Sequence, residues 1–143
     1  MLRDLYSDLF PVVGNKIDAR TKAAGAVDGE VIDLGIFEGA GIFCAAGTLG
    51  AQVNTYEFEL KEAGAAEGPF TAVADEDLLG SEPSFVQNGV DVNESDTVKS
   101  FGYAGSKRYI RVDLKAPAGA GTGGGVVGAL VIKGHARHKP AVS

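Results

Sequence analysis

Two segments of the chain alternate strictly between apolar and polar residues. Tyr56, Phe58 and Leu60 alternate with charged residues, and aliphatic residues alternate with charged residues from Ile110 to Leu114. A period of two places the apolar side chains on one face of a strand and leaves the other face in water. These segments therefore predict antiparallel strands that are half-buried on a core.

The other strand-prone runs are short and end at glycine or turn residues. We expect them at residues 31–34, 41–45, 70–73, 97–103 and 108–115. A turn-like sequence at residues 104–107 separates the last two, which predicts a β-hairpin. The acidic stretch 74–82 and the stretch 85–96, which contains the turn signal Asn88-Gly89, are predicted to be irregular.

Residues 126–133 form a run that is apolar at nearly every position. Such a run predicts a strand in a central or covered position, because neither of its faces suits water. With this strand the chain has about seven or eight short strands, and no convincing long helix accompanies them. The predicted fold class is all-β, an antiparallel β-sandwich or jelly roll.

The amino-terminal segment, residues 1–27, differs from the rest. Leu2, Leu5, Tyr6 and Leu9 share one face at helical spacing, and Pro11 would end such a helix. An extended or short-helical segment is therefore expected. It either lies on its own domain or docks as an arm on a neighbouring subunit, because its apolar residues need burial. The predicted organisation is an arm at 1–27, a β-sandwich at 28–134 and a basic tail at 135–143.

Size and charge exclude several classes of protein. A chain of 143 residues suits one domain. The 13 Lys and Arg against 19 Asp and Glu give a net charge of −6, which argues against general nucleic-acid binding. Asp4 and Asp8 interrupt any signal peptide, and the longest nearly apolar run is far shorter than the roughly 20 residues of a membrane helix. We expect a soluble protein made in a cytoplasm, with no membrane partner.

No motif predicts an enzyme, a cofactor or a metal site. Residues 119–124 satisfy the letters of GxGxxG but precede a strand, which indicates a flexible loop rather than a nucleotide site. His135 and His138 are flanked by Arg137 and Lys139, which would repel a cation. The acidic residues around 75–77 and 91–96 lack the EF-hand pattern, so solvated turns are the better interpretation. Cys44 lies in an apolar run, which favours a core thiol over a nucleophile.

In order along the chain, several segments resemble a family of small virion proteins encoded among the head and tail genes of tailed bacteriophages and phage-like particles. The resemblance covers about residues 30–140. It is carried by residues 32–43, 58–62, 70–79, 101–112 and 128–138, of which 102–112 is the most specific part. Residues 80–93 and 118–125 depart from the family, which leaves their local contacts open.

The resemblance implies a non-enzymatic β-rich structural protein, present in many copies in a virion and made in the host bacterial cytoplasm. It implies a capsid-associated decoration protein or the base of a head spike or fibre, with a head-tail connector component as an alternative. The implied partners are the major capsid protein or other virion proteins, together with further copies of the chain.

We predict that the amino-terminal segment and the basic tail make these contacts. The predicted contact residues are Leu5, Tyr6, Leu9, Phe10, Val12, Arg137 and Lys139. A different class, a carbohydrate-binding β-sandwich for cell-surface adhesion, is disfavoured because the chain has no Trp and only four Tyr to form a sugar platform. A glycan partner is therefore not expected.

Overall fold

The computed structural model describes residues 9–20, 25–49, 54–87, 93–119 and 124–136. In these ranges the chain is almost entirely β, which confirms the predicted fold class. The strands are β1 (Leu9–Arg20), β2 (Ile32–Asp33), β3 (Phe37–Ala46), β4 (Asn54–Ala63), β5 (Thr71–Ala72), β6 (Leu78–Leu79), β7 (Ser84–Gln87), β8 (Thr97–Tyr103), β9 (Tyr109–Leu114), β10 (Ala118–Gly119) and β11 (Gly125–Ala136). A 3₁₀ turn, η2, occupies Asp75–Asp77.

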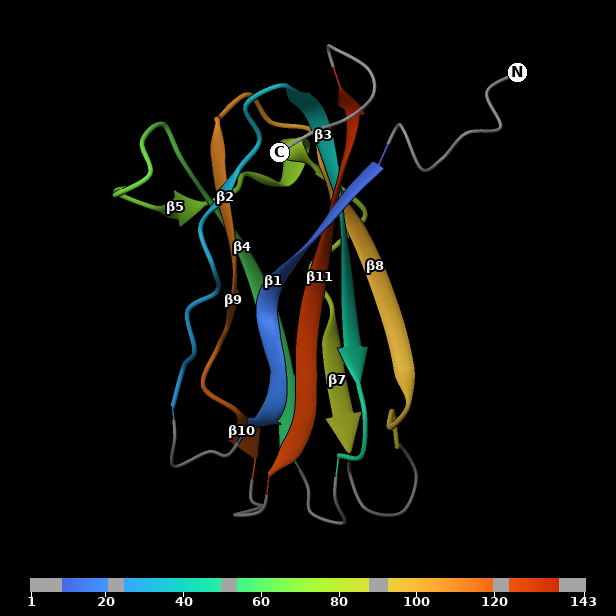
Figure 1. Ribbon diagram of the computed structural model, residues 1–143. Coiled ribbons are helices and arrows are strands. Elements are labelled where there is room, and N and C mark those ends of the chain that lie inside the picture. The colour runs from blue at the N-terminus through green and yellow to red at the C-terminus, as the bar shows by residue number, and fades with distance from the viewer. Residues whose placement is uncertain (1–8, 21–24, 50–53, 88–92, 120–123, 137–143) are drawn as a thin grey trace, which may run out of the picture.

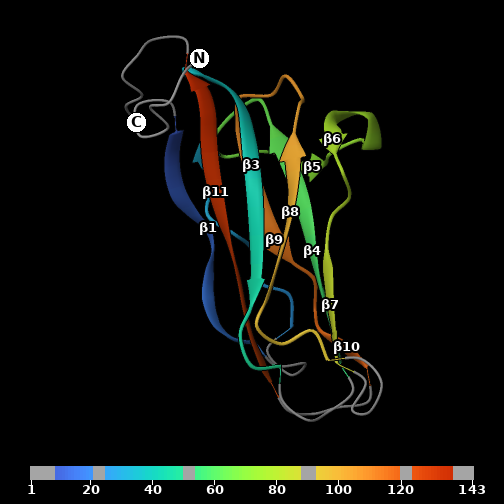
Figure 2. The ribbon, with the colours of Figure 1, turned by 90° about the vertical axis from the view of Figure 1, so that its right-hand side faces the viewer.

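The strands form two antiparallel sheets that pack face to face (Figures 1 and 2). One has five strands in the order β1-β11-β3-β8-β6 and is called here the β11 sheet. The other has the order β10-β4-β9-β2, with β5 and β7 also pairing with β4, and is called the β4 sheet. Figure 2 shows β1, β11, β3 and β8 side by side. The arrangement is the predicted antiparallel sandwich.

The core lies between the inner faces of the two sheets. As the alternation predicts, Tyr56, Phe58 and Leu60 of β4 are buried, and so are Ile110, Val112 and Leu114 of β9. The β11 sheet contributes buried residues at alternate positions, among them Ile42, Cys44, Val127 and Val131. The rings of Phe58 and Phe85 meet edge to face with centroids 6.3 Å apart, a favoured aromatic geometry.

The predicted hairpin is wrong, although both of its arms are strands. β8 pairs with β3 and β6 in the β11 sheet, whereas β9 pairs with β4 and β2 in the β4 sheet. The connection therefore crosses from one sheet to the other. Tyr103 holds this crossing, because its hydroxyl donates to Oε1 of Glu62 at 2.7 Å and accepts the backbone N–H of Lys107 at 3.0 Å. The buried faces of β8 and β9 consequently face each other across the core.

Two segments predicted to be irregular contain strands. Ser84–Gln87 forms β7, which pairs with β4 so that Phe85 lies opposite Tyr56. Glu94 supports it by accepting the backbone N–H of Val86 through Oε1 at 2.9 Å. The acidic stretch contains η2 and the two-residue strand β6. The turn signal Asn88-Gly89 lies outside the described residues.

The amino-terminal segment is extended from Leu9 onward. β1 pairs along its whole length with β11, from Leu9 opposite Gly134 to Arg20 opposite Gly125. Leu9, the last residue of the expected helical face, is therefore a strand residue, and the rest of that face lies outside the described residues. At the other end of the chain, β11 continues to Ala136, so His135 belongs to a strand rather than to a tail.

A bulge in β1 ties the two sheets together. The register of β1 against β11 shifts on both sides of Asn15, and the Asn15 side chain is buried. Its Nδ2 donates to the carbonyl of Val27 at 3.2 Å and to the carbonyl of Val112 in β9 at 3.1 Å. Because both acceptors belong to segments bonded to the β4 sheet, Asn15 fastens the edge of one sheet to the other.

We predict that Asn15→Ala lowers the free energy of unfolding by about 1–3 kcal/mol, because it removes both donors and leaves a buried gap. Urea denaturation followed by circular dichroism measures this change. Lys16→Ala, at an exposed neighbouring position, is the control and should change stability by less than about 0.5 kcal/mol. Equal stability of the two variants would contradict the role assigned to Asn15.

Candidate interaction surface

The outer face of the β4 sheet is charged. Directly opposite positions on β4 and β9 carry like charges, Glu59 opposite Asp113 and Lys61 opposite Arg111. Opposite charges pair across the strands and along one strand. Lys61 Nζ of β4 lies 3.3 Å from Asp113 Oδ2 of β9, and Arg111, two residues before Asp113 on β9, binds both of its oxygens at 2.8 and 2.9 Å. The hydrogen bond to Asp113 raises the pKa of Lys61. This face therefore carries a partly buried ladder of paired charges.

The outer face of the β11 sheet is apolar. Its outward positions are filled by aliphatic, aromatic and glycine residues, and we call this set the apolar face. Its members are Leu9, Pro11, Val13 and Ile17 of β1, Gly128, Leu130, Ile132 and Gly134 of β11, Gly39, Gly41, Phe43 and Ala45 of β3, Val98, Ser100 and Gly102 of β8, and Leu79 of β6. Val98 is 64% exposed and Leu79 is 62% exposed. Ser100 is the only polar member, and none of the members is charged.

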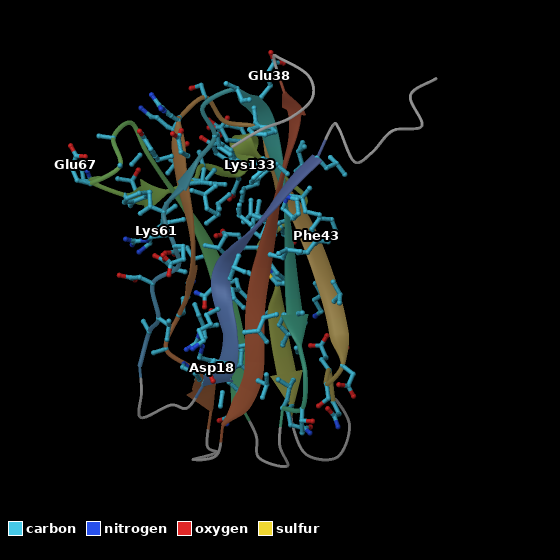
Figure 3. All side chains as sticks on the ribbon, viewed as in Figure 1. Asp18, Glu38, Phe43, Lys61, Glu67 and Lys133 are labelled. Atoms are coloured by element: carbon cyan, nitrogen blue, oxygen red, sulfur yellow. The ribbon has the colours of Figure 1, made fainter. Side chains whose placement is uncertain are left out.

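Charged side chains in β8 and β11 point away from this face. Lys99 of β8 donates to the carbonyl of Ser84 at 2.7 Å and pairs with Glu94. Lys133 of β11 is buried, and its Nζ lies 4.8 and 5.0 Å from the ring centroids of Phe10 and Phe37. Burial lowers the pKa of Lys133. Figure 3 shows Lys133 between the sheets, with Phe43 and Lys61 on their opposite outer sides.

Glycines shape the apolar face into a hollow. A Cβ atom at Gly41 would lie 3.3 Å from the ring of Phe43, and one at Gly102 would lie 3.1 Å from Leu79. At Gly134 the nearest atom would be a methyl of Leu9 at 3.4 Å. The large side chains thus lie back over neighbouring glycines. Between them is a hollow of about 370 Å³, lined mainly by apolar atoms.

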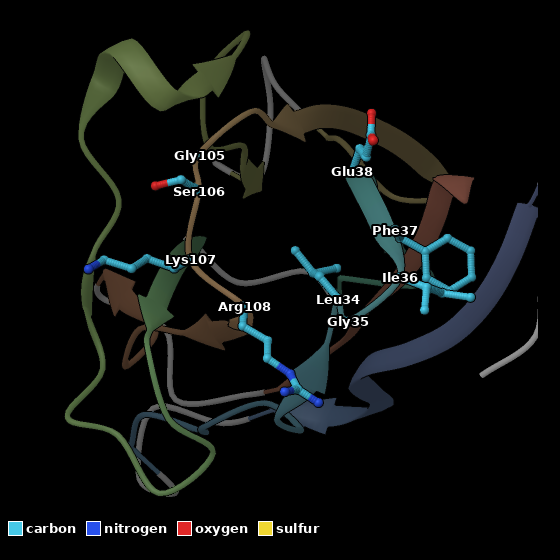
Figure 4. Close-up of a pocket in the computed structure, with 9 residues that line it drawn as sticks. All are labelled: Leu34, Gly35, Ile36, Phe37, Glu38, Gly105, Ser106, Lys107 and Arg108. Carbon is cyan, nitrogen blue, oxygen red and sulfur yellow. The ribbon is translucent and has the colours of Figure 1, made fainter. Parts of the chain in front are cut away.

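A second hollow, of about 580 Å³, lies at one end of the sandwich between residues 34–38 and residues 105–108 (Figure 4). Of its three charged lining residues, Glu38, Lys107 and Arg108, the last is already bound to both carboxylate oxygens of Asp33, at 2.8 and 2.9 Å. This hydrogen-bonded guanidinium holds the pKa of Asp33 below its usual value. In Figure 4 the side chains of Ser106 and Lys107 point away from Glu38. Polar groups therefore do not converge in this hollow.

The predicted contact residues fall in different places. Leu9 belongs to the apolar face. Phe10 turns the other way, with its ring centroid 6.2 Å from that of Phe37, and Val12 packs against the core. The remaining predicted contacts, Leu5, Tyr6, Arg137 and Lys139, lie outside the described residues.

Most of the apolar face was not predicted as a contact site. The signal that could have found it was the run at 126–133, whose apolar character on both faces predicted a covered strand. The inner residues Val127, Ala129 and Val131 are covered by the β4 sheet. On the outer side, Leu130 remains 37% exposed, and no described element of the chain packs over it.

Other candidate sites have structural roles or fall outside the described chain. Cys44 is fully buried, and burial raises the pKa of its thiol to about 12, which agrees with a core thiol. Within the described ranges, no cluster of three or more His, Cys, Asp and Glu is placed to hold a metal ion. The described chain also contains no helix long and apolar enough to cross a membrane. His138 and residues 120–123 of the glycine-rich loop are not among the described residues.

No protein-family model matches the chain, and no curated protein matches its sequence. Among solved structures, the chain is similar to the crystal structure of the SPBc2 prophage-derived protein YomS. The match covers 87% of this chain and 95% of that chain, with 13% sequence identity and a TM-score of 0.48.

We predict that the charged ladder serves stability. Asp113→Ala should lower the free energy of unfolding by about 2–4 kcal/mol, because it leaves the half-buried Arg111 and the N–H of Gly29 without this carboxylate. Glu57→Ala, whose side chain is 53% exposed, should change stability by less than about 0.5 kcal/mol. Urea denaturation of both variants measures the difference, and a small effect at Asp113 would contradict this role.

Proposed function

We propose that this protein is a non-enzymatic structural subunit of a tailed-phage-like virion. In this proposal it associates with the capsid, as a decoration protein or as the base of a head spike or fibre. Its partners are the major capsid protein or other virion proteins, and it acts through protein–protein contacts repeated over many copies. The resemblance of residues 30–140 to small virion proteins supports the class of particle.

The observation that carries this proposal is the apolar face. Side chains such as Leu79 and Val98, both more than half exposed, lie on one continuous surface with no charged member. Soluble proteins rarely leave such a surface in water, and its presence favours a protein partner. On a symmetric particle, modest contacts repeated in many copies add up to stable attachment.

The net charge of the chain also favours a protein partner. The net charge of −6 disfavours nucleic acid and anionic membranes as partners. A glycan partner is also disfavoured, because Phe43 is the only aromatic member of the apolar face, and sugar platforms use several aromatic rings. The termini remain proposed secondary contacts through Leu5, Tyr6, Arg137 and Lys139.

Quantitative mass spectrometry of purified particles tests this function. We expect the chain in particles at a fixed ratio to the major capsid protein. A ratio of roughly one per capsid subunit or capsomer indicates decoration, and five or six per vertex indicates a spike base. About a dozen copies per particle would indicate the connector instead. Absence from particles, together with binding on a glycan array, would overturn the proposal in favour of an adhesion module.

A further inference from the structure

One edge of the β11 sheet is protected against pairing with another chain. At this edge, β1 carries Pro11, which has no N–H to donate, and two register shifts around Asn15. Proline and bulges are devices that block edge-to-edge addition. At the other edge, the two-residue strand β6 pairs only with Tyr103 and Gly102, and the rest of β8 has no strand partner on that side within the described residues. Along β1, a partner therefore meets the face of the sheet rather than extending its strands.

The charge distribution permits a second copy of the same chain as the partner of this face. Two molecules that each carry a net charge of −6 repel one another over most of their surfaces. The apolar face is a region where two copies can approach without opposing like charges, because none of its members is charged. Lys99 and Lys133 point inward and therefore add no charge to this face, although burial desolvates Lys133.

The shape of the face is self-complementary. The hollow lies around Gly39, Gly41 and Gly102, toward one end of the strands. Val98 and Val13, which are 64% and 54% exposed, project from the face nearer the other end. A twofold axis that lies between two such faces and runs across the strands brings the projecting side chains of one copy onto the hollow of the other. Such an isologous arrangement needs only one surface that carries both features.

The area is also sufficient for association. With strands about 4.8 Å apart and a rise of about 3.4 Å per residue, the face covers roughly 500 Å². This is near the upper end of the largest apolar patches on monomers, about 300–600 Å². It is also a large part of the about 800 Å² that each partner contributes to a standard interface.

From these observations we infer that the apolar face binds the apolar face of a second copy, so that two β11 sheets pack face to face about 10 Å apart. The inference deepens the proposed function, on which it rests, by naming the contact between copies. It assigns Phe43 and Leu130 of the central strands, together with Val98 and Leu79 nearer one edge, to the dimer interface.

Sedimentation equilibrium of the purified full chain tests this inference. We expect a monomer–dimer equilibrium for the wild type and a loss of the dimer in Val98→Glu and Leu79→Glu, because each variant would bury a charge in the interface. The matched control is Val31→Glu. Val31 is 45% exposed and precedes β2 of the β4 sheet, so its variant should dimerise like the wild type. Circular dichroism and urea denaturation establish that each variant is folded.

A wild type that remains monomeric at high micromolar concentration would overturn the inference, and so would a dimer that persists in both face variants. Equal loss of the dimer in Val31→Glu, or a closed trimer in the wild type, would overturn the face-to-face arrangement. These results are independent of mass spectrometry on particles: a monomer that is incorporated into particles would refute the dimer alone, whereas a dimer absent from particles would refute the virion role alone.

Discussion

A strand with apolar side chains on both faces needs cover on both, and β11 obtains it within the described chain on only one. Its inner residues Val127 and Val131 are fully buried against the β4 sheet, and this burial is the main favourable term in folding. Its backbone is satisfied on both sides, by β1 and by β3. What remains is the outer row with Leu130 and Ile132. The position of β11 between β1 and β3 organises the β11 sheet. The outward side chains of β11 form part of the apolar face, which no described element of the chain covers.

Beside the apolar core, polar side chains of the described residues connect the two sheets on the side away from the apolar face. Asn15 bonds β1 to the carbonyl of Val112 across the sandwich, and Tyr103 binds Glu62 where the chain crosses from one sheet to the other. Such hydrogen bonds fix the orientation of the sheets, because breaking either of them leaves a buried or partly buried polar group without its partner. The sheet that carries the apolar face is therefore held rigidly by contacts on its inner side.

Local alternation predicted the strands but could not predict their partners. The patterns of β8 and of Ile110–Leu114 indicate which face of each strand is buried. Both a hairpin within one sheet and a connection from one sheet to the other would bury these faces. The choice depends on Tyr103 and Glu62, which lie 41 positions apart in sequence. The short strand β7 was missed because its four residues gain their strand character from pairing with β4 rather than from their own pattern. For the surface, the run at 126–133 indicated that both faces needed cover, but Phe43, Val98 and Leu79 join that surface only through long-range pairing.

Stability and association are therefore assigned to opposite sides of the same sheet. The inner side carries the large buried residues, and the outer side carries side chains that lie back on glycines such as Gly41 and Gly102. Because glycine adds no side chain to this layer, the outer face gains little from packing within one subunit and keeps a hollow that a partner can fill. A residue such as Val98, more than half exposed, can then change without loss of the core. This separation allows the outer surface to be fitted to a partner while the fold is maintained from within.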